Sequence, residues 1–165
     1  MTWEDEGQRA EHVEAVEVSL EVSLRAITRE NYRECLRLRV TPEQEQFVAT
    51  NAVSLAEAKY EPELEPWAIF AGARMVGFVM YGENAEDGAH WIHRLMLDIA
   101  HQRHGYGRAA LRLVLDRLRA QPTCREIAIS WVPSNEVAER LYLSLGFVKT
   151  GEILWGERVG RLRVR

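Results

Sequence analysis

The chain has 165 residues, 47% of them hydrophobic, which suits one domain with its own buried core. Its 21 basic and 25 acidic residues give a net charge of -4, so a nucleic-acid partner is not expected, because such domains usually carry a basic surface. Two distant cysteines, Cys35 and Cys124, fit no metal-ligand or CxxC pattern, and no apolar run reaches the roughly 18 residues that span a bilayer; we therefore expect a cytoplasmic protein with no metal and no membrane partner.

The N-terminal half alternates between polar and apolar segments. Residues 1–20 are rich in glutamate and lack an apolar stripe, which predicts a flexible acidic extension, and residues 21–165 are predicted to form a single domain. Within that domain, alternating apolar residues predict a strand over 22–27, and the polar residues after it cap a helix over 32–38. The segment 41–66 is polar and helix-prone, which predicts short helices.

Three β-rich segments follow. Residues 67–71 and 75–81 are apolar runs separated by Gly72-Ala73-Arg74, which predicts a hairpin with a short loop. After a polar loop, residues 90–99 predict a third strand of the same antiparallel meander.

The C-terminal half predicts two further helices. An amphipathic helix follows Gly107, and a buried strand follows over 126–132. Asn135 caps a second helix, for which the apolar face is expected to carry Val137, Ala138, Leu141 and Leu145, and a hairpin turning at Gly156-Glu157 ends the chain. The order β, αα, βββ, α, β, α, ββ predicts an α/β domain with a mixed sheet.

A glycine-containing loop, QRHGYG at 102–107, joins the third meander strand to the amphipathic helix. Such a loop can cradle an anion, because the first amides of a helix have no partner, but it can equally be a simple turn. A Walker loop would need lysine and a hydroxyl residue after Gly107, where Arg108-Ala109 stand. A dinucleotide site would need an acidic residue at the end of the next strand, where Ser130-Trp131-Val132 stand, so both nucleotide interpretations are disfavoured.

Two motifs together resemble the GNAT superfamily of N-acetyltransferases. The pattern L-x-L-x-x-x-x-Q-x-x-G-x-G, formed by Leu95, Leu97, Gln102, Gly105 and Gly107, resembles its acetyl-CoA-binding signature. The segment NEVAERLYLSLGF at 135–147 is similar to its N-x-x-A-x-x-x-Y-x-x-x-G-F element. The resemblance runs from Leu24 to the C-terminus and implies a mixed, largely antiparallel sheet of six or seven strands, flanked by about four helices, with a splayed central strand pair that holds CoA.

The resemblance also implies which residues bind acetyl-CoA, the expected cosubstrate. The loop would bind the pyrophosphate through backbone amides, aided by the arginines, and its residues are Gln102, Arg103, His104, Gly105, Tyr106, Gly107 and Arg108. The backbone of Leu95, Met96 and Leu97 would pair with the pantetheine arm and supply an oxyanion donor. Asn135 would bind CoA, and Tyr142 would protonate the departing sulfur. From the residues alone, 95–97 is a core strand, Asn135 a helix cap and Tyr142 a core aromatic.

The general base is less determined. A primary amine with a pKa of about 10.4 must lose a proton before it attacks. His93 lies two residues before Leu95, so on a regular strand it points to the same side and is a candidate base. Water relaying to Glu83, Glu45 or His90 is an equal alternative. Tyr81 and Trp91 are expected to be walls of the substrate pocket, together with Glu83 and His93, with a place in the core as the alternative for either aromatic.

The expected function is transfer of an acetyl group from acetyl-CoA to a primary amine of a small molecule, by direct attack through a tetrahedral intermediate. The segments GFVMYG and WIHRLMLD and the final hairpin resemble bacterial spermine and spermidine acetyltransferases, which implies a polyamine, although Arg94 would repel a polycation if it faced the pocket. An aminoglycoside, an amino acid or a peptide N-terminus stays open as the acceptor, as does a CoA sensor without turnover. The edge of the C-terminal hairpin could pair with a second copy to form a homodimer, or it could be capped by its own arginines; both stay open.

Overall fold

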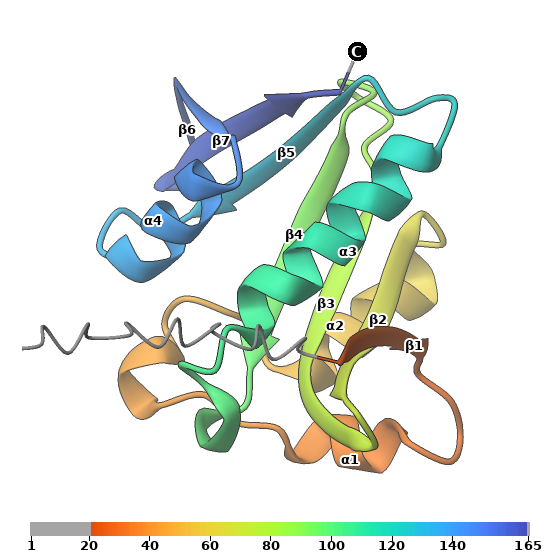
Figure 1. Cartoon of the computed structure of the whole chain (residues 1–165). Coiled ribbons are helices and arrows are strands. Elements are labelled where there is room, and N and C mark those ends of the chain that lie inside the picture. Colours follow the sequence, from red (N-terminus) through yellow and green to blue (C-terminus); the bar gives the residue numbers. More distant parts are fainter. Residues whose placement is uncertain (1–20, 165) are drawn as a thin grey trace, which may run out of the picture.

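The computed structural model describes residues 21–164, so the extension expected over residues 1–20 lies outside the described residues (Figure 1). Its elements, in chain order, are β1 (Val22–Ala26), α1 (Tyr32–Arg37), a 3-10 turn (Pro42–Gln44), α2 (Asn51–Tyr60), β2 (Leu64–Ala71), β3 (Arg74–Glu83), β4 (His90–Leu97), a second 3-10 turn (Ile99–His101), α3 (Tyr106–Ala120), β5 (Glu126–Trp131), α4 (Glu136–Ser144), β6 (Val148–Leu154) and β7 (Glu157–Arg163). This order is the one that the sequence predicts. The boundaries differ at β2, which begins before residue 67, and at β4, which ends before residue 99 because the side chain of Asp98 caps a new turn.

The strands form one seven-stranded sheet in the order β1-β2-β3-β4-β5-β7-β6. Neighbouring strands are antiparallel except β4 and β5, which pair in parallel. The expected mixed, largely antiparallel sheet is therefore confirmed.

The helices cover the sheet on both faces. α3 and α4 pack on one face, which we call the α3 face, and α1 and α2 pack on the other, the α2 face (Figure 1). The predicted apolar stripe of α3 is buried in the core of the α3 face and consists of Ala110, Leu111, Val114, Leu115 and Leu118. Each such large apolar side chain contributes about 1.5–3 kcal/mol when fully buried, so this stripe fixes α3 across β1 and β4.

The predicted apolar face of α4 is only partly correct. Ala138, Leu141 and Leu145 pack against the core, but Val137 is 71% exposed. The first turn of α4 extends beyond the edge of the core, and Val137 lines a cleft there. Periodicity places a residue on a helix face but does not show where the neighbouring layer ends.

A gap opens in the middle of the sheet. β4 and β5 are paired only from His90 and Ile127 to Ile92 and Ile129. Beyond these positions the two strands diverge, as Figure 1 shows. The expected splayed central pair is therefore present.

The divergence begins at a bulge in β4. Tyr81 of β3 lies opposite Ile92, but the next residue, Met80, lies opposite Arg94, so His93 is an extra residue in β4. A bulge bends its strand and increases the local twist. Because the bulge directly follows the last residue paired with β5, it accounts for the point at which β4 turns away.

Candidate active site

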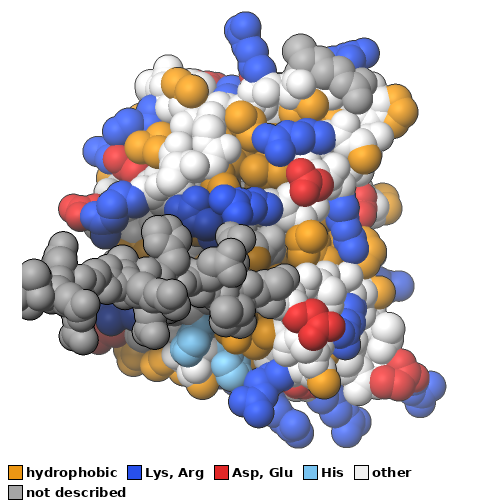
Figure 2. All heavy atoms as spheres, viewed as in Figure 1, with side chains coloured by type: hydrophobic (Ala, Val, Ile, Leu, Met, Phe, Trp, Pro, Cys, Tyr) orange, Lys and Arg blue, Asp and Glu red, His pale blue; other side chains and the backbone are white. Residues whose placement is uncertain are grey.

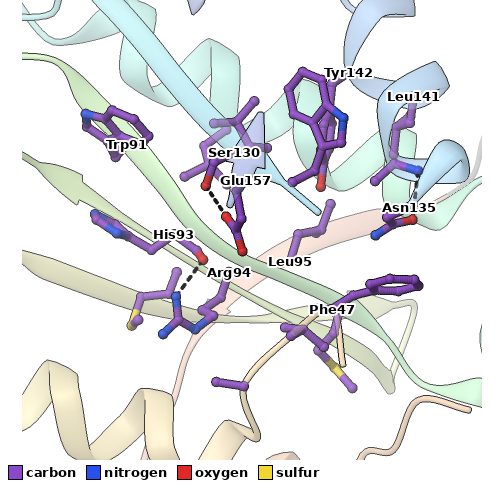
Figure 3. A pocket seen from close by; sticks show the side chains of 18 of the residues that line it. Phe47, Trp91, His93, Arg94, Leu95, Ser130, Asn135, Leu141, Tyr142 and Glu157 are labelled. Atoms are coloured by element: carbon purple, nitrogen blue, oxygen red, sulfur yellow. Dashed lines mark hydrogen bonds between the residues drawn. The ribbon is translucent and has the colours of Figure 1, made fainter. Parts of the chain in front are cut away.

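A cleft of about 1620 Å³ occupies the gap between β4 and β5 and extends to both faces of the sheet (Figure 3). Its walls come from segments far apart in the sequence: α2 with the segment before it, β4, the loop before α3, the start of α4, and the β6–β7 hairpin.

The loop before α3 presents unpaired backbone amides to the cleft. Gly105 has a left-handed backbone with φ 80°, which glycine adopts without strain, and α3 begins at the next residue. Within the described chain, the amides of Tyr106, Gly107 and Arg108 find no hydrogen-bond acceptor. The positive end of the dipole of this 15-residue helix lies at the same place, so the loop is suited to hold a phosphate group.

The side chains of the loop divide into two groups. Gln102, Arg103, Gly105, Gly107 and Arg108 line the cleft. His104 and Tyr106 stack on each other, with 5.6 Å between their ring centroids, and do not line it. These two residues can therefore contribute backbone amides, while their rings support the outside of the loop.

Two polar side chains hold the loop in place. Gln102 donates its amide to the side-chain oxygen of Gln44 at 2.8 Å and to the carbonyl of Leu97 at 3.1 Å. Arg108 donates to the hydroxyl of Ser144 at 2.7 Å, which links the start of α3 to the end of α4. Both residues thus have structural partners in addition to the cofactor role expected of them.

The strand before the loop has one open edge. Leu95, Met96 and Leu97 pair with β3 on one side, while on the other side β5 has already diverged. The backbone N–H and C=O groups of this segment that face the gap can pair with an extended ligand chain, as an additional strand would, except the carbonyl of Leu97, which accepts the hydrogen bond from Gln102. In Figure 3, Leu95 points from this strand toward Tyr142 and Asn135.

Asn135 can serve both of the roles considered for it. Its side-chain oxygen accepts a hydrogen bond from the amide of Ala138 at 3.2 Å and so caps α4. Its amide nitrogen points into the cavity (Figure 3) and can donate to a ligand. The cap therefore orients the donor.

Tyr142 projects from α4 into the same cleft and is 7% exposed. Its ring contacts Trp131 and Phe147 edge to face, with ring centroids 5.6 and 6.3 Å apart. Burial raises the pKa of its hydroxyl well above that of a free tyrosine, and the carboxylate of Glu157 raises it further. The hydroxyl is therefore protonated over the whole physiological range and can act as a proton donor.

The expectation that His93 shares a side with Leu95 is wrong, because the bulge interrupts the strand alternation. Leu95 packs with the core of the α3 face, whereas Arg94 reaches Glu57 of α2 on the other face. His93 turns away from Leu95 in Figure 3, lines the cleft, and lies within the electrostatic influence of Glu57. It therefore belongs to the α2 face.

The imidazole of His93 is held in its neutral form. Desolvation by burial lowers its pKa, and the guanidinium of Arg94 lowers it further, against the opposing effect of Glu57 and Glu63. At neutral pH it can accept a proton or a hydrogen bond and adds no positive charge to the cleft.

The other residues expected at the substrate end are distributed unevenly. Trp91 and Glu45 line the cleft. Tyr81 is buried in the core beneath α3, Glu83 ends β3 and does not line the cleft, and the buried His90 is hydrogen-bonded to Gln121 at 2.8 Å. Tyr81 lies opposite Ile92 and so faces the core of the α3 face, not the substrate end of the cleft. We therefore do not assign a substrate or relay role to Tyr81, Glu83 or His90, none of which lines the cleft.

Sequence reasoning missed Glu157 and Ser130. Glu157 begins β7 and was interpreted only as a residue of the final turn, yet it lines the cleft and accepts a hydrogen bond from the hydroxyl of Ser130 on β5. The available signal was strand alternation, because Glu157 lies two residues before the buried Val159 and so shares its face.

Charge is unequal across the cleft. Eight carboxylates and five guanidinium groups line it. Arg103 and Arg108 belong to the loop, and on the α3 face basic side chains are more prominent than acidic ones (Figure 2). On the α2 face, Arg94 is paired with Glu57 at 3.0 Å, so its charge is compensated. One end of the cleft is suited to an anion and the other to a cation.

Within residues 21–164, no group of histidine, cysteine and acidic side chains is arranged to hold a metal ion. No helix of that region has the length and apolar character needed to cross a membrane.

Comparison with known proteins agrees with this geometry. The model of the acetyltransferase (GNAT) family matches residues 23–147. The spermine/spermidine N(1)-acetyltransferase of Bacillus subtilis (strain 168) is 29% identical over 147 residues, which cover 85% of this chain and 97% of that protein.

Two solved structures show the same fold. An acetyltransferase from Thermus thermophilus has a TM-score of 0.69 at 16% identity, covering 87% of this chain and 97% of the other. A spermidine N-acetyltransferase from Vibrio cholerae, in complex with CoA and spermine, has a TM-score of 0.68 at 18% identity, covering 86% and 93%. The chain belongs to the GNAT family, and it is an acetyl-CoA-dependent N-acetyltransferase.

Proposed function

We propose that this acetyltransferase acetylates a primary amino group of a polyamine such as spermidine or spermine. The observation that carries the proposal is the excess of carboxylates in the cleft, together with the pairing of Arg94 by Glu57. Because Glu57 neutralises the charge of Arg94, this guanidinium no longer repels a polycation. The repulsion expected from the sequence is therefore no argument against a polyamine. The Bacillus subtilis relative, which is named for spermine and spermidine, supports the same substrate class.

The cofactor enters from the α3 face in this proposal. The unpaired amides before α3 bind its pyrophosphate, and the open edge of β4 binds the pantetheine arm with the thioester at the gap. A backbone amide of the segment from Leu95 to Leu97 donates to the thioester oxygen as negative charge develops on it. Asn135 supplies one further hydrogen bond from the start of α4.

The amine enters from the α2 face and attacks the thioester directly. A tetrahedral intermediate forms and collapses, and Tyr142 gives its proton to the departing sulfur. The attacking amine must first lose a proton, and the α2 face offers two groups that can accept it, the imidazole of His93 and the carboxylate of Glu157. Trp91 forms part of the wall along which the acceptor lies.

An acceptor screen tests this proposal. Thiol release from acetyl-CoA would be measured with spermidine, spermine, an aminoglycoside, an amino acid and a peptide N-terminus. We expect saturable turnover with the polyamines. Activity with the aminoglycoside and none with polyamines would overturn the substrate class. Tight acetyl-CoA binding with no turnover on any amine would instead indicate a sensor.

A homodimer and a cytoplasmic location complete the proposal. β6 is an edge strand of the sheet and carries exposed apolar side chains at Val148 and Ile153, which supports pairing with a second copy. Cys35 and Cys124 are both buried, which is compatible with a reducing compartment. Light scattering after gel filtration should give twice the 19.0 kDa mass of the chain; the mass of a monomer would contradict the dimer.

A further inference from the structure

Glu157 occupies a distinctive place at the gap. It is the first residue of β7, and its carboxylate points into the cavity over β4, between His93 and Leu95 (Figure 3). Ser130 lies near the end of β5, where that strand has diverged from β4. Its hydroxyl donates a hydrogen bond to one oxygen of the Glu157 carboxylate. Because β5 and β7 are neighbouring strands, Ser130 orients this side chain from the same wall of the gap.

The carboxylate of Glu157 has no basic partner in the described chain. Three other acidic residues around the cleft are paired across elements: Glu57 with Arg94 at 3.0 Å, and Asp87 and Glu152 with Arg161 at 3.2 and 2.9 Å. Glu45, Glu61 and Glu86 also lack an ion pair in the described chain, but none of them lies on β5 or β7 at the gap. The basic side chain next to it, Arg158, pairs with Glu139 instead, at 2.8 Å. A partly buried carboxylate satisfied by a single hydroxyl lacks a counter-charge, and a substrate ammonium can supply it.

Glu157 also lies close to the reacting end of the cofactor. Its charge acts on Tyr142, the group that protonates the sulfur in the proposed function, and both side chains lie on the β5 side of the gap and line the cleft. Tyr142 comes from the α3 face, whereas Glu157 shares the face of Ser130 and Val159. A thioester at the gap therefore has an acid on one side and a carboxylate on the other.

We propose that Glu157, positioned by Ser130, is the carboxylate that binds the attacking amino group and accepts its proton. The identity of the amine rests on the proposed function, but the role of Glu157 applies to any primary amine. Glu157 is a catalytic residue in this proposal, and Ser130 is a positioning residue.

Atoms and charges balance in this step. The ammonium transfers one proton to the carboxylate of Glu157, and the freed lone pair forms the C–N bond at the thioester carbon. The C–S bond breaks as the carbonyl re-forms, and the sulfur takes the proton of Tyr142. The substrate nitrogen then loses a second proton to solvent, and the phenolate of Tyr142 takes up a proton from solvent. One ammonium and one thioester yield one amide, one thiol and one released proton.

Two observations favour Glu157 over His93 for this role. His93 is neutral and stands beside Arg94, so it cannot attract an ammonium as a carboxylate does. The bulge also turns the imidazole away from Leu95, whereas the carboxylate of Glu157 points toward the gap (Figure 3).

The variant Glu157→Gln tests the role, because it keeps the shape and removes the charge. We expect kcat/KM for the amine to fall about 100-fold or more at pH 7, as for loss of a general base, with the Kd for acetyl-CoA by calorimetry unchanged. The deficit should narrow as the pH rises, because below the amine pKa the free amine fraction grows about tenfold per pH unit. Glu65→Gln, which removes an exposed strand carboxylate outside the cleft, is the matched control and should behave as wild type.

Ser130→Ala tests the positioning role. We expect a fall in kcat of about 3- to 10-fold, with a KM for acetyl-CoA equal to that of wild type and partial recovery in Ser130→Thr, which restores the hydroxyl. An unchanged kcat in Ser130→Ala would overturn the positioning role.

Three results would overturn the assignment of Glu157. They are a Glu157→Gln enzyme with wild-type kcat/KM, a deficit that is constant with pH, or a full loss in His93→Gln with none in Glu157→Gln. Should Glu157→Gln not fold, Glu157→Asp keeps the charge one methylene further back, and a wild-type rate there at every pH would overturn it equally. If the wild type prefers another amine over polyamines, the same variants are measured with that amine, so failure of the substrate class does not decide the role of Glu157.

Discussion

The two sides of the gap between β4 and β5 are built differently. The α3 side presents backbone amides, an open strand edge, one amide side chain and a buried phenol. The α2 side presents charged side chains from α2, β4 and β7. The first side can bind any molecule that carries the same pyrophosphate and extended arm, whereas the second depends on the charge and length of the acceptor. Acetyl-CoA, which is the same in every reaction of this kind, is thus bound mainly by backbone groups, whereas the amine acceptor is bound by side chains.

Removal of the Tyr142 hydroxyl should have the largest effect on the α3 side. In Tyr142→Phe we expect kcat to fall about 100-fold or more, because the departing thiolate loses its proton donor, while the Kd for acetyl-CoA stays close to that of wild type. Steady-state thiol release and calorimetry would measure the two quantities. Equal loss in kcat and affinity would show that Tyr142 only packs.

The pH dependence provides a second check on Tyr142. Because its pKa is raised in the folded protein, the acid form persists above the usual tyrosine pKa of about 10. The wild-type kcat should therefore not decline between pH 8 and about pH 10 through loss of this proton. A decline there that is absent in Tyr142→Phe would contradict the assignment.

On the α2 side, the ion pair of Arg94 and Glu57 should control the affinity for a polycation. Glu57→Gln leaves the guanidinium uncompensated, and we expect the KM for spermidine to rise about tenfold, equivalent to about 1.4 kcal/mol. Arg94→Gln should leave this KM unchanged or lower it. Because both side chains are partly exposed, the difference should shrink at high salt.

The control for this comparison is a monoamine acceptor. With a single charge it should show a smaller change in Glu57→Gln than spermidine does. An equal change with both acceptors, or a loss of acetyl-CoA affinity, would show that the pair stabilises the fold of α2 and does not sense the acceptor.

Asn135 allows the two contributions of one side chain to be separated. Asn135→Ser keeps a cap for α4 but not the amide that points into the cleft, so we expect the acetyl-CoA Kd to rise about 3- to 10-fold, the value of one hydrogen bond. Asn135→Ala should show the same rise and also lower the free energy of unfolding by about 1 kcal/mol. Urea unfolding and calorimetry would distinguish the two variants. Unchanged affinity in both would restrict Asn135 to capping.

The sequence predicted the α3 side far better than the α2 side, for a physical reason. The unpaired amides come from one short segment, since Gly105 and the start of α3 are adjacent in the chain. The sequence motif therefore includes every residue of this part of the site. The α2 side is assembled by tertiary packing from Glu57, His93 and Glu157, and no local pattern links these three positions.

The bulge at His93 is the feature that sequence reasoning lacked. The order of elements, the hairpins and the stripe of α3 followed from periodicity and turn residues. A one-residue bulge in β4 reverses which of its residues face each side, so sequence alternation placed His93 on the wrong side. Tyr81 lies on β3 and is part of the buried core, which its apolar neighbours in the sequence allowed but did not decide. Nothing in the run WIHRLML signals an extra residue, because the bulge depends on the register with β3.

The smallest expected effect concerns the stability of the α2 side in acid. The pKa of His93 in the folded protein lies below its ordinary value of about 6.5, so as the pH falls through that value the unfolded chain binds a proton that the folded chain does not. The contribution of His93 to the free energy of unfolding is therefore complete above about pH 6.5 and is lost as the pH falls toward the folded pKa. Between pH 7.5 and pH 5.5, the free energy of unfolding from urea titrations should therefore decrease more for wild type than for His93→Gln. The difference between the two proteins should be smaller than the effect of losing the Asn135 cap. An identical decrease in the two proteins would mean that the imidazole is solvated in the folded state, and the α2 side would then be open to water at the bulge.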